Sequence, residues 1–231
     1  MTEKLNIKKS LNLLGGCLLG VMASGFMTVA NLYAQDAETA ESKNSDQYEA
    51  FVNKTGNAII QILVNKGSPL SSRKIEFRRV LNSQFDMNAI GKFVMSKYWR
   101  GLNEDQKQTF LKLFKEAVVE NYAAQFDNYH NEKLDVRGSY ETPDKGIVVQ
   151  SHIIRPAGGP PLKVDWKIFR TKNGFKVLDI VVDGVSMSIT LRSEYTGVFQ
   201  SNGGMGGGGV EALFKYLRDK ISSPSSSEDS E

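Results

Sequence analysis

Few residues of this chain have side chains suited to acid–base or metal chemistry. The 231 residues include two histidines, His130 and His152, and one cysteine, Cys17. No HxxxH or HExxH spacing is present, so the sequence contains no zinc-binding motif. His130 lies in the polar run DNYHNEK, which is typical of a solvated surface. His152 lies in VVQSHIIRP, and nothing near it marks a nucleophile that it could activate. We therefore predict no metal site, no cofactor and no catalytic residue.

Two other patterns superficially match functional motifs. Asp179 and Asp183 flank an apolar segment as an acid–base pair could, but Asp183-Gly184 is an ordinary turn dipeptide. The run Gly204 to Gly209 (GMGGGG) formally matches GxGxxG. A dinucleotide site needs a strand before its glycines, whereas here a helix is predicted before them. We interpret the glycine run as a flexible hinge.

The charge distribution argues against a nucleic-acid partner. The formal net charge is +3, and Lys4, Lys8 and Lys9 together with Glu3 place +2 of it in the first nine residues. The remaining residues therefore carry only +1. A protein that binds phosphate backbones needs a basic surface, and the body of this chain does not supply one.

The N-terminal residues have the pattern of a secretory leader. No charged residue occurs between Ser10 and Gln35, and this apolar run follows three lysines. We predict a signal peptide over residues 1–34, with cleavage after Ala30 or Ala34; the sequence does not decide between these sites. The run is long for a leader, so an uncleaved membrane anchor is the alternative. Removal of the leader would leave a mature protein without a thiol.

The rest of the chain divides into one folded domain and two polar flanks. Residues 35–44 (QDAETAESKN) lack aromatic side chains, and we predict a flexible linker there. Residues 222–231 (SSPSSSEDSE) predict a disordered tail for the same reason. The folded domain is expected over residues 45–221, with 40% hydrophobic and 24% charged residues in the whole chain, as in ordinary globular proteins.

Helices are predicted at both ends of the domain. The first runs from Ser45 to Gly67, Ser68 begins a second, and Asp86 caps a third. A long helix is predicted from Asn103 to about Asn128, with Gln106 completing a capping-box pair. Its apolar residues recur every four positions, which by itself indicates a packed core. This stripe consists of Phe110, Phe114, Val118, Tyr122 and Phe126.

Strands follow the long helix, because the hydrophobic period changes from 3.6 to 2 after His130. Short turns join them, including the hairpin dipeptide Asn173-Gly174. Two more helices are expected over residues 186–201 and 210–221. The fold class is therefore α+β, with a four-stranded antiparallel sheet covered by helices. The four strands begin at about Leu134, Ile147, Leu162 and Phe175.

Three segments of the domain resemble one known family. They are Lys97 to Tyr129, beginning KYWRGLNEDQ; Phe175 to Tyr195, containing DGVS and RSEY; and VEALFKYLRDK after the glycine run. In this order and spacing they resemble the MlaC, or toluene-tolerance, family of periplasmic phospholipid-binding proteins. The resemblance covers nearly all of residues 45–221. The chain departs from the family pattern at Trp166, where tyrosine is common, at Phe175, where tryptophan is common, and in its longer glycine run.

The resemblance implies a fold and a function. The sheet would be curved and wrapped by helices, as in the NTF2-like cone. The protein would be a periplasmic carrier, an auxiliary component of an ABC transporter, that moves phospholipid between an inner-membrane ABC-type complex and an outer-membrane lipoprotein complex. Such transport maintains the lipid asymmetry of the outer membrane and contributes to solvent tolerance. We expect a monomer, because transient docking on two complexes requires weak, partly polar interfaces.

Under this interpretation, residues on the inward faces of the helices and strands would line a lipid cavity. The physical basis is that acyl chains exposed to water are costly, at about 0.8 kcal/mol per methylene. The expected lipid-binding residues are Phe93, Val94, Trp99, Phe114, Val118, Val149, Val164, Trp166, Val185 and Met187.

Two alternative functions stay open from the sequence. An NTF2-like enzyme would use a His/Asp pair in its cavity, which His152 and Asp165 could supply. An envelope adaptor would bind hopanoids or other apolar lipids instead of carrying phospholipid.

We also propose that the hinge Gly203 to Gly209 lets the last helix move as the cavity fills, with Leu213, Phe214 and Leu217 facing inward.

Overall fold

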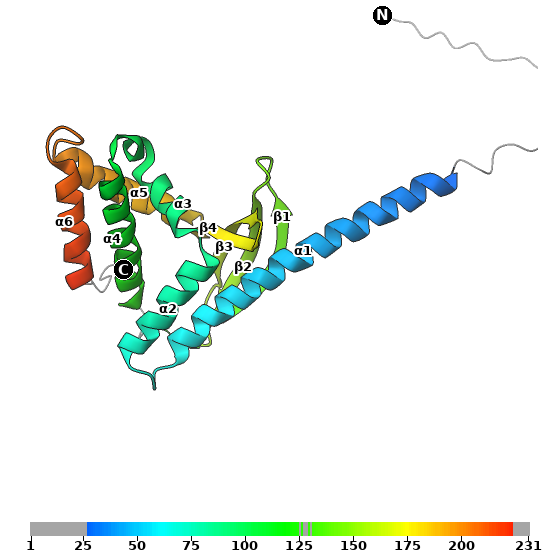
Figure 1. The fold of residues 1–231 in the computed structure, drawn as a ribbon. Helices are drawn as coiled ribbons and strands as arrows, with labels where there is room; N and C mark the ends of the chain where they lie inside the picture. The colour runs from blue at the N-terminus through cyan, green and yellow to red at the C-terminus, as the bar shows by residue number, and fades with distance from the viewer. Residues whose placement is uncertain (1–26, 125, 127–128, 130, 224–231) are drawn as a thin grey trace, which may run out of the picture. The chain divides into compact units, whose positions relative to one another are not determined.

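The computed structural model describes residues 27–124, 126, 129 and 131–223 (Figure 1). Most of the predicted leader, His130 and residues 224–231 of the predicted tail lie outside the described residues. The helices are α1 (Met27–Val64), α2 (Leu70–Gln84), α3 (Met87–Met95), the 3₁₀ helix η1 (Ser96–Gly101), α4 (Glu104–Ala123), α5 (Met187–Ser201) and α6 (Gly209–Ser222). The strands are β1 (Lys133–Glu141), β2 (Ile147–Ile154), β3 (Leu162–Thr171), β4 (Gly174–Val182) and β5 (Val185–Ser186).

The chain separates into two compact units, Met1–Glu41 and Ser42–Glu231. Helix α1 contributes its beginning to the first unit and its remainder to the second. The helix continues through residues 35–44, where composition predicts a flexible linker; the Ala, Glu, Gln and Lys residues there all favour helix. The predicted leader, its cleavage and the linker stay predictions.

The helix boundaries follow local hydrogen bonds that the sequence largely predicts. The Asp86 carboxylate accepts the N–H of Ala89 at 2.9 Å and caps α3. Asn103 and Gln106 form the predicted capping box, with bonds of 2.8 and 3.0 Å. The Ser68-Pro69 pair predicts Ser68 as the N-cap of α2 and Pro69 in its first turn. This is wrong in one detail, because Pro69 occupies the N-cap position and makes no side-chain bond. Pro69 fixes a backbone φ that suits a helix start.

The sheet is an open antiparallel meander with the order β1-β2-β3-β4-β5. It confirms the predicted class but has five strands rather than four. The additional strand, β5, arises because Asp183 and Gly184 both have positive φ, at 45° and 86°, and turn the chain back onto Val181 and Val182. The Asp183 carboxylate accepts the N–H of Lys163 at 3.0 Å, which confirms its structural role in a turn.

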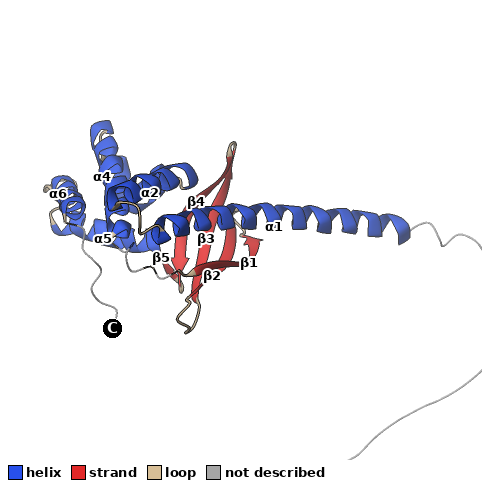
Figure 2. Ribbon diagram, turned by 90° about the horizontal axis from the view of Figure 1, so that it is seen from below, coloured by secondary structure: helices blue, strands red, loops and turns tan. Residues whose placement is uncertain are grey.

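Two hydrophobic cores lie side by side in the second unit. The larger is helical and is built around Phe110 and Phe114 of α4. The smaller lies between the sheet and α1, where Tyr48 and Val52 pack with Trp166. Figures 1 and 2 show α1 crossing one face of the sheet, while α4, α5 and α6 gather beyond the β5 edge. The sheet and the helical group therefore have distinct cores that meet at a seam, where Ile59 and Phe85 pack against both.

The glycine run forms a compact turn between α5 and α6. The N–H of Gly204 donates to the carbonyl of Phe199 at 3.0 Å, and that of Gly209 donates to the carbonyl of Gly204 at 2.9 Å. A Cβ on Gly209 would lie 2.3 Å from the Phe199 carbonyl oxygen. Glycine is thus required there by close backbone approach. Movement at this turn stays a prediction.

Candidate functional site

A cavity of about 250 Å³ lies at the seam between the two cores. Helix α4 forms one wall with Phe114, Val118 and Tyr122, which belong to the aromatic stripe expected from the sequence. Helix α2 adds Phe77 and Leu81, one turn apart on the same face. These side chains present almost only carbon atoms, so the helical wall can contact an apolar ligand without leaving polar groups unpaired.

The opposite wall comes from the sheet, chiefly from Trp166 of β3 and Ile180 of β4. These two residues are cross-strand partners and share a face. The indole N–H of Trp166 donates to the hydroxyl of Ser151 at 3.0 Å, and that hydroxyl donates to the Val164 carbonyl at 2.8 Å. Because its one polar group is satisfied inside the sheet, Trp166 contributes an apolar ring surface to the cavity.

The carboxylate of Asp179, the charged side chain in the cavity lining, is already engaged in hydrogen bonds. Asp179 accepts the N–H of Ser188 at 3.0 Å and the hydroxyl of Ser186 at 2.6 Å. The ammonium of Lys167 lies 3.4 Å from the same carboxylate. Burial raises the pKa of the Tyr122 hydroxyl above its ordinary value, and the negative charge of Asp179 raises it further. Asp179 therefore anchors the start of α5 and is not an unpartnered acid in the cavity.

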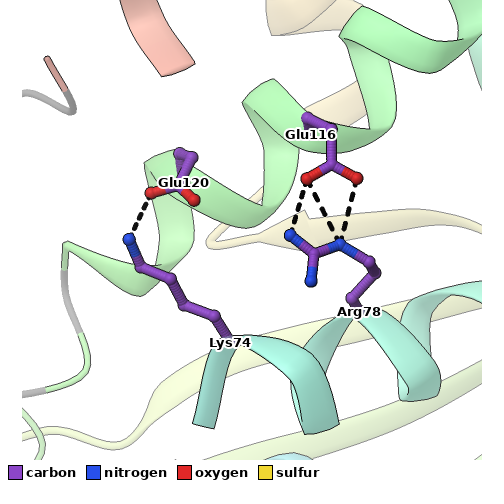
Figure 3. Close-up of polar contacts among 4 residues, drawn as sticks. All are labelled: Lys74, Arg78, Glu116 and Glu120. Carbon is purple, nitrogen blue, oxygen red and sulfur yellow. Dashed lines mark hydrogen bonds and ion pairs between the residues drawn. The ribbon is translucent and has the colours of Figure 1, made fainter. Parts of the chain in front are cut away.

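Two ion pairs hold α2 against α4, the helices that form the helical wall (Figure 3). Arg78 binds Glu116 through both of its carboxylate oxygens, with a closest approach of 2.6 Å, and Lys74 binds Glu120. The bond to Glu116 raises the pKa of Arg78. Each helix supplies two residues four positions apart, which lie on one face. The earlier residue of α2 pairs with the later residue of α4, so the two helices run antiparallel here. They lie outside the apolar lining and fix the spacing of two of its elements.

Four of the ten residues expected from the sequence line this cavity: Phe114, Val118, Trp166 and Met187. The other six do not. Val94 is fully buried in the helical core, where Trp99 also packs. Val149 and Val164 share the face of Trp166, but they are buried in the smaller core with residues of α1. Phe93 and Val185 are exposed side chains.

These differences have physical causes. Helix α1 covers the part of the sheet face that carries Val149 and Val164, so that part becomes core rather than cavity. In α3 the cavity-lining residues are Met87 and Ile90, and Phe93 lies on the outer side. The sequence interpretation also missed lining residues on other elements. For α2, the four-residue spacing of Phe77 and Leu81 could have indicated an inward-facing apolar pair. The missed residues are Ile59, Phe77, Leu81, Phe85, Met87, Ile90, Tyr122, Leu178, Asp179, Ile180, Val182, Ser188 and Leu191.

The pair required for an NTF2-like enzyme is absent from the cavity lining. His152 pairs with Lys163 and Asp165 pairs with Gln150, so both lie on the sheet face opposite Trp166. The Nδ1 atom of His152 is buried without a hydrogen-bond partner among the described residues. The geometry does not place a His/Asp pair where a ligand in this cavity could reach it.

Two further features are absent from the described part of the chain. Within it, no group of three or more His, Cys, Asp or Glu side chains is arranged to hold a metal ion. Among the same residues, no helix combines the length and apolar character needed to span a bilayer.

This chain is similar to known proteins both in sequence and in fold. One similar protein is the intermembrane phospholipid transport system binding protein MlaC of Haemophilus influenzae, 25% identical over 137 residues. The match spans 58% of this chain and 61% of that relative, so it covers about three fifths of the relative's length. A solved phospholipid-binding protein from Ralstonia solanacearum, in complex with a phospholipid, has a similar fold. The two structures superpose with a TM-score of 0.62 and have 21% sequence identity. The superposition covers 75% of this chain and 96% of the other.

The sequence model of the family described as MlaC protein matches residues 53–219. This range contains the described α4 stripe, the whole sheet and nearly all of α6. All the residues named as lining the cavity therefore lie in the segment that matches the family, and the chain belongs to the MlaC family.

Proposed function

We propose that this protein is a phospholipid carrier whose apolar cavity takes up acyl chains. The observation that carries the proposal is a cavity at the seam of two cores with an almost wholly apolar lining. Two acyl tails with roughly thirty methylenes would cost on the order of 24 kcal/mol to expose to water, so a carrier must enclose them. The names of the relative and of the structural neighbour support phospholipid as the ligand.

The cavity must enlarge to enclose a whole lipid. Its volume of about 250 Å³ is just below the roughly 300–1,000 Å³ of ordinary ligand pockets. Most buried residues of the helical and sheet walls belong to different hydrophobic cores, so a movement of the walls apart would mainly change contacts at the seam, where Ile59 and Phe85 pack against both cores. The described cavity then corresponds to a form that encloses only part of a chain.

The cellular role that we propose follows from the leader and the family. The protein would be exported to the periplasm as a monomer and would move phospholipid between an inner-membrane ABC-type complex and an outer-membrane lipoprotein complex. That transport would maintain outer-membrane lipid asymmetry. The lining contains no polar group reserved for one headgroup, so a hopanoid or another apolar lipid is an outcome that the experiment must distinguish.

Organic extraction of the purified protein, followed by mass spectrometry, tests the proposal. We expect phospholipid in the extract of the unaltered chain. The informative variant is Met187→Asp, because Met187 lines the cavity at the first position of α5. A carboxylate at this position favours the helix, so we expect the variant to fold. Its matched control is Met205→Asp, in the exposed glycine turn.

Phospholipid in the control and its loss from Met187→Asp is the expected result. Equal phospholipid in both variants would show that this cavity is not the binding site. Extracts without phospholipid, or with hopanoid instead, would overturn the carrier assignment.

A further inference from the structure

The phenolic hydroxyl of Tyr122 is the polar exception among the residues of α2 and α4 that line the cavity. It has no hydrogen-bond partner among the described residues. The other polar side chains of the lining differ in this respect, because those of Trp166, Asp179 and Ser188 have partners of their own. Tyr122 therefore brings an unused hydrogen-bond donor to an otherwise apolar helical wall.

The surroundings of Tyr122 hold its ring at the cavity. The ring stands edge-on to that of Phe77, another lining residue, with centroids 6.4 Å apart. Tyr122 is 36% exposed, so part of its side chain is free for contact with a ligand. Burial nevertheless raises the pKa of its hydroxyl, and the negative charge of Asp179 raises it further. The hydroxyl thus lies in poorly hydrated surroundings within range of the Asp179 carboxylate.

Tyr122 lies at one end of the apolar wall. It belongs to the last turn of α4, about one turn beyond Val118 and two beyond Phe114. Near the same end, the Asp179 carboxylate is approached by the ammonium of Lys167, whose side chain is 49% exposed. This end of the cavity is therefore close to the protein surface. A lipid can place its polar part here and its acyl chains along Val118 and Phe114.

Acyl chains in the cavity would leave the Tyr122 hydroxyl in need of an acceptor. Water can bond to the hydroxyl only until the chains displace it, and methylenes accept no hydrogen bond. A hydroxyl that is buried without a partner costs free energy. The acceptors nearest to the acyl chains of a phospholipid are its ester carbonyl oxygens, which are neutral. A phosphate group at this place would be repelled by the charge of Asp179.

We infer that the Tyr122 hydroxyl donates a hydrogen bond to an ester carbonyl of the bound phospholipid. The bond sets how far the acyl chains enter the cavity and makes Tyr122 a specificity-determining residue. The inference rests on the proposed function and adds a preference to it. Ester-linked lipids bind more tightly than lipids with the same chains and headgroup but no carbonyl, by about threefold to tenfold for one such bond.

The test compares two forms of phosphatidylethanolamine with chains of equal length, one a diester and the other a diether. The diether lacks both carbonyls and keeps the phosphate. Delipidated protein is offered both lipids in competition, and mass spectrometry of the extract gives the ratio bound. The variant is Tyr122→Phe, which removes the hydroxyl and keeps the ring. Its matched control is Tyr140→Phe, because Tyr140 lies in β1, is 50% exposed and does not line the cavity.

We expect the unaltered chain and Tyr140→Phe to take up about threefold to tenfold more diester than diether, and Tyr122→Phe to take up both equally. The preference should be lost through weaker binding of the diester, since the diether has no carbonyl to lose. Equal uptake of both lipids by the unaltered chain, or a preference that Tyr122→Phe retains, would overturn the inference.

Two further readouts separate this contact from a structural role and from the proposed function. Tyr122→Phe breaks no hydrogen bond within the described residues, so its unfolding temperature should not fall below that of the unaltered chain. A lower unfolding temperature with equal loss of both lipids would make Tyr122 a structural residue and refute the ester contact. Uptake of both lipids without preference would refute the contact and leave the carrier function standing, whereas uptake of neither by the unaltered chain would overturn both.

Discussion

The carboxylate of Asp179 in β4 accepts the backbone N–H of Ser188 in α5 at 3.0 Å. It also accepts the hydroxyl of Ser186, so one buried side chain fastens the first turn of α5 to the sheet. The lining residues Met187 and Leu191 lie on this helix. The position of one cavity wall therefore depends on a polar contact that bridges the helical and sheet bodies.

Replacing Asp179 by asparagine should destabilise the protein. Asparagine retains one acceptor oxygen but loses the charge that strengthens both hydrogen bonds and attracts Lys167. We expect the free energy of unfolding, measured in urea, to fall by about 1–2 kcal/mol.

The matched control for this variant is Asp183→Asn. Asparagine tolerates the positive φ at this exposed turn and still accepts the Lys163 N–H, so we expect a change within about 0.5 kcal/mol. Equal effects of the two substitutions would contradict the anchoring role of Asp179.

The hydrophobic period of the sequence predicts only some of the residues that line the cavity. The four-residue spacing of Phe114 and Val118 identifies a common apolar face of α4, and both residues line the cavity. Alternation in β3 likewise places Val164 and Trp166 on one face, yet only Trp166 reaches the cavity. The hydrophobic period shows which residues of a helix or strand share a face. It does not show what covers that face, because this depends on tertiary packing. Here α1 covers Val164 and leaves Trp166 at the cavity.

The role of Asp179 also depends on tertiary structure and could not be predicted from the sequence pattern. In the sequence it is one acidic residue in an apolar strand, and its partners at Ser186 and Ser188 are brought close only by the turn at Asp183-Gly184. That turn was predictable from its dipeptide. The two-residue strand β5 that follows it was not, because two residues carry no measurable alternation.

The ion pair between Arg78 and Glu116 should contribute modestly to stability. Arg78→Gln removes a two-oxygen contact between α2 and α4 that is about one-third exposed. Solvent screening limits the loss to about 0.5–1 kcal/mol at low salt, and the loss should shrink at high salt.

The neighbouring residue offers a control, since Arg79 is exposed on the outer side of α2. Urea unfolding of Arg79→Gln should agree with the unaltered chain to within about 0.5 kcal/mol. If the effect of Arg78→Gln is as small as this, or does not depend on salt, the pair does not brace the two helices.

The two tryptophans should report ligand binding differently. Trp166 lines the cavity, whereas Trp99 packs against Phe110 in the helical core, with ring centroids 6.4 Å apart. Acyl chains in the cavity would contact only the Trp166 indole. The fluorescence difference between lipid-loaded and delipidated protein should therefore persist in Trp99→Phe and disappear in Trp166→Phe. A difference that disappears in Trp99→Phe instead would place the ligand elsewhere.

Gly209→Ala should strongly destabilise the turn that connects α5 and α6. The added Cβ would lie 2.3 Å from the Phe199 carbonyl oxygen and 2.7 Å from that of Gly204, and both neighbours are backbone atoms that cannot rotate away. We expect the free energy of unfolding to fall by at least about 2 kcal/mol. Gly206→Ala is the control, because a Cβ there meets open space, and alanine should be neutral or slightly stabilising.

These two variants also separate the structural role of the run from the proposed hinge. A hinge requires backbone freedom throughout Gly203 to Gly209, so Gly206→Ala would then slow lipid transfer between vesicles even though it leaves stability unchanged. A turn that only needs close backbone approach would be insensitive to Gly206→Ala and sensitive to Gly209→Ala. The hydrogen bonds from Gly204 to Phe199 and from Gly209 to Gly204 favour the second outcome, because a hinge movement would have to break them.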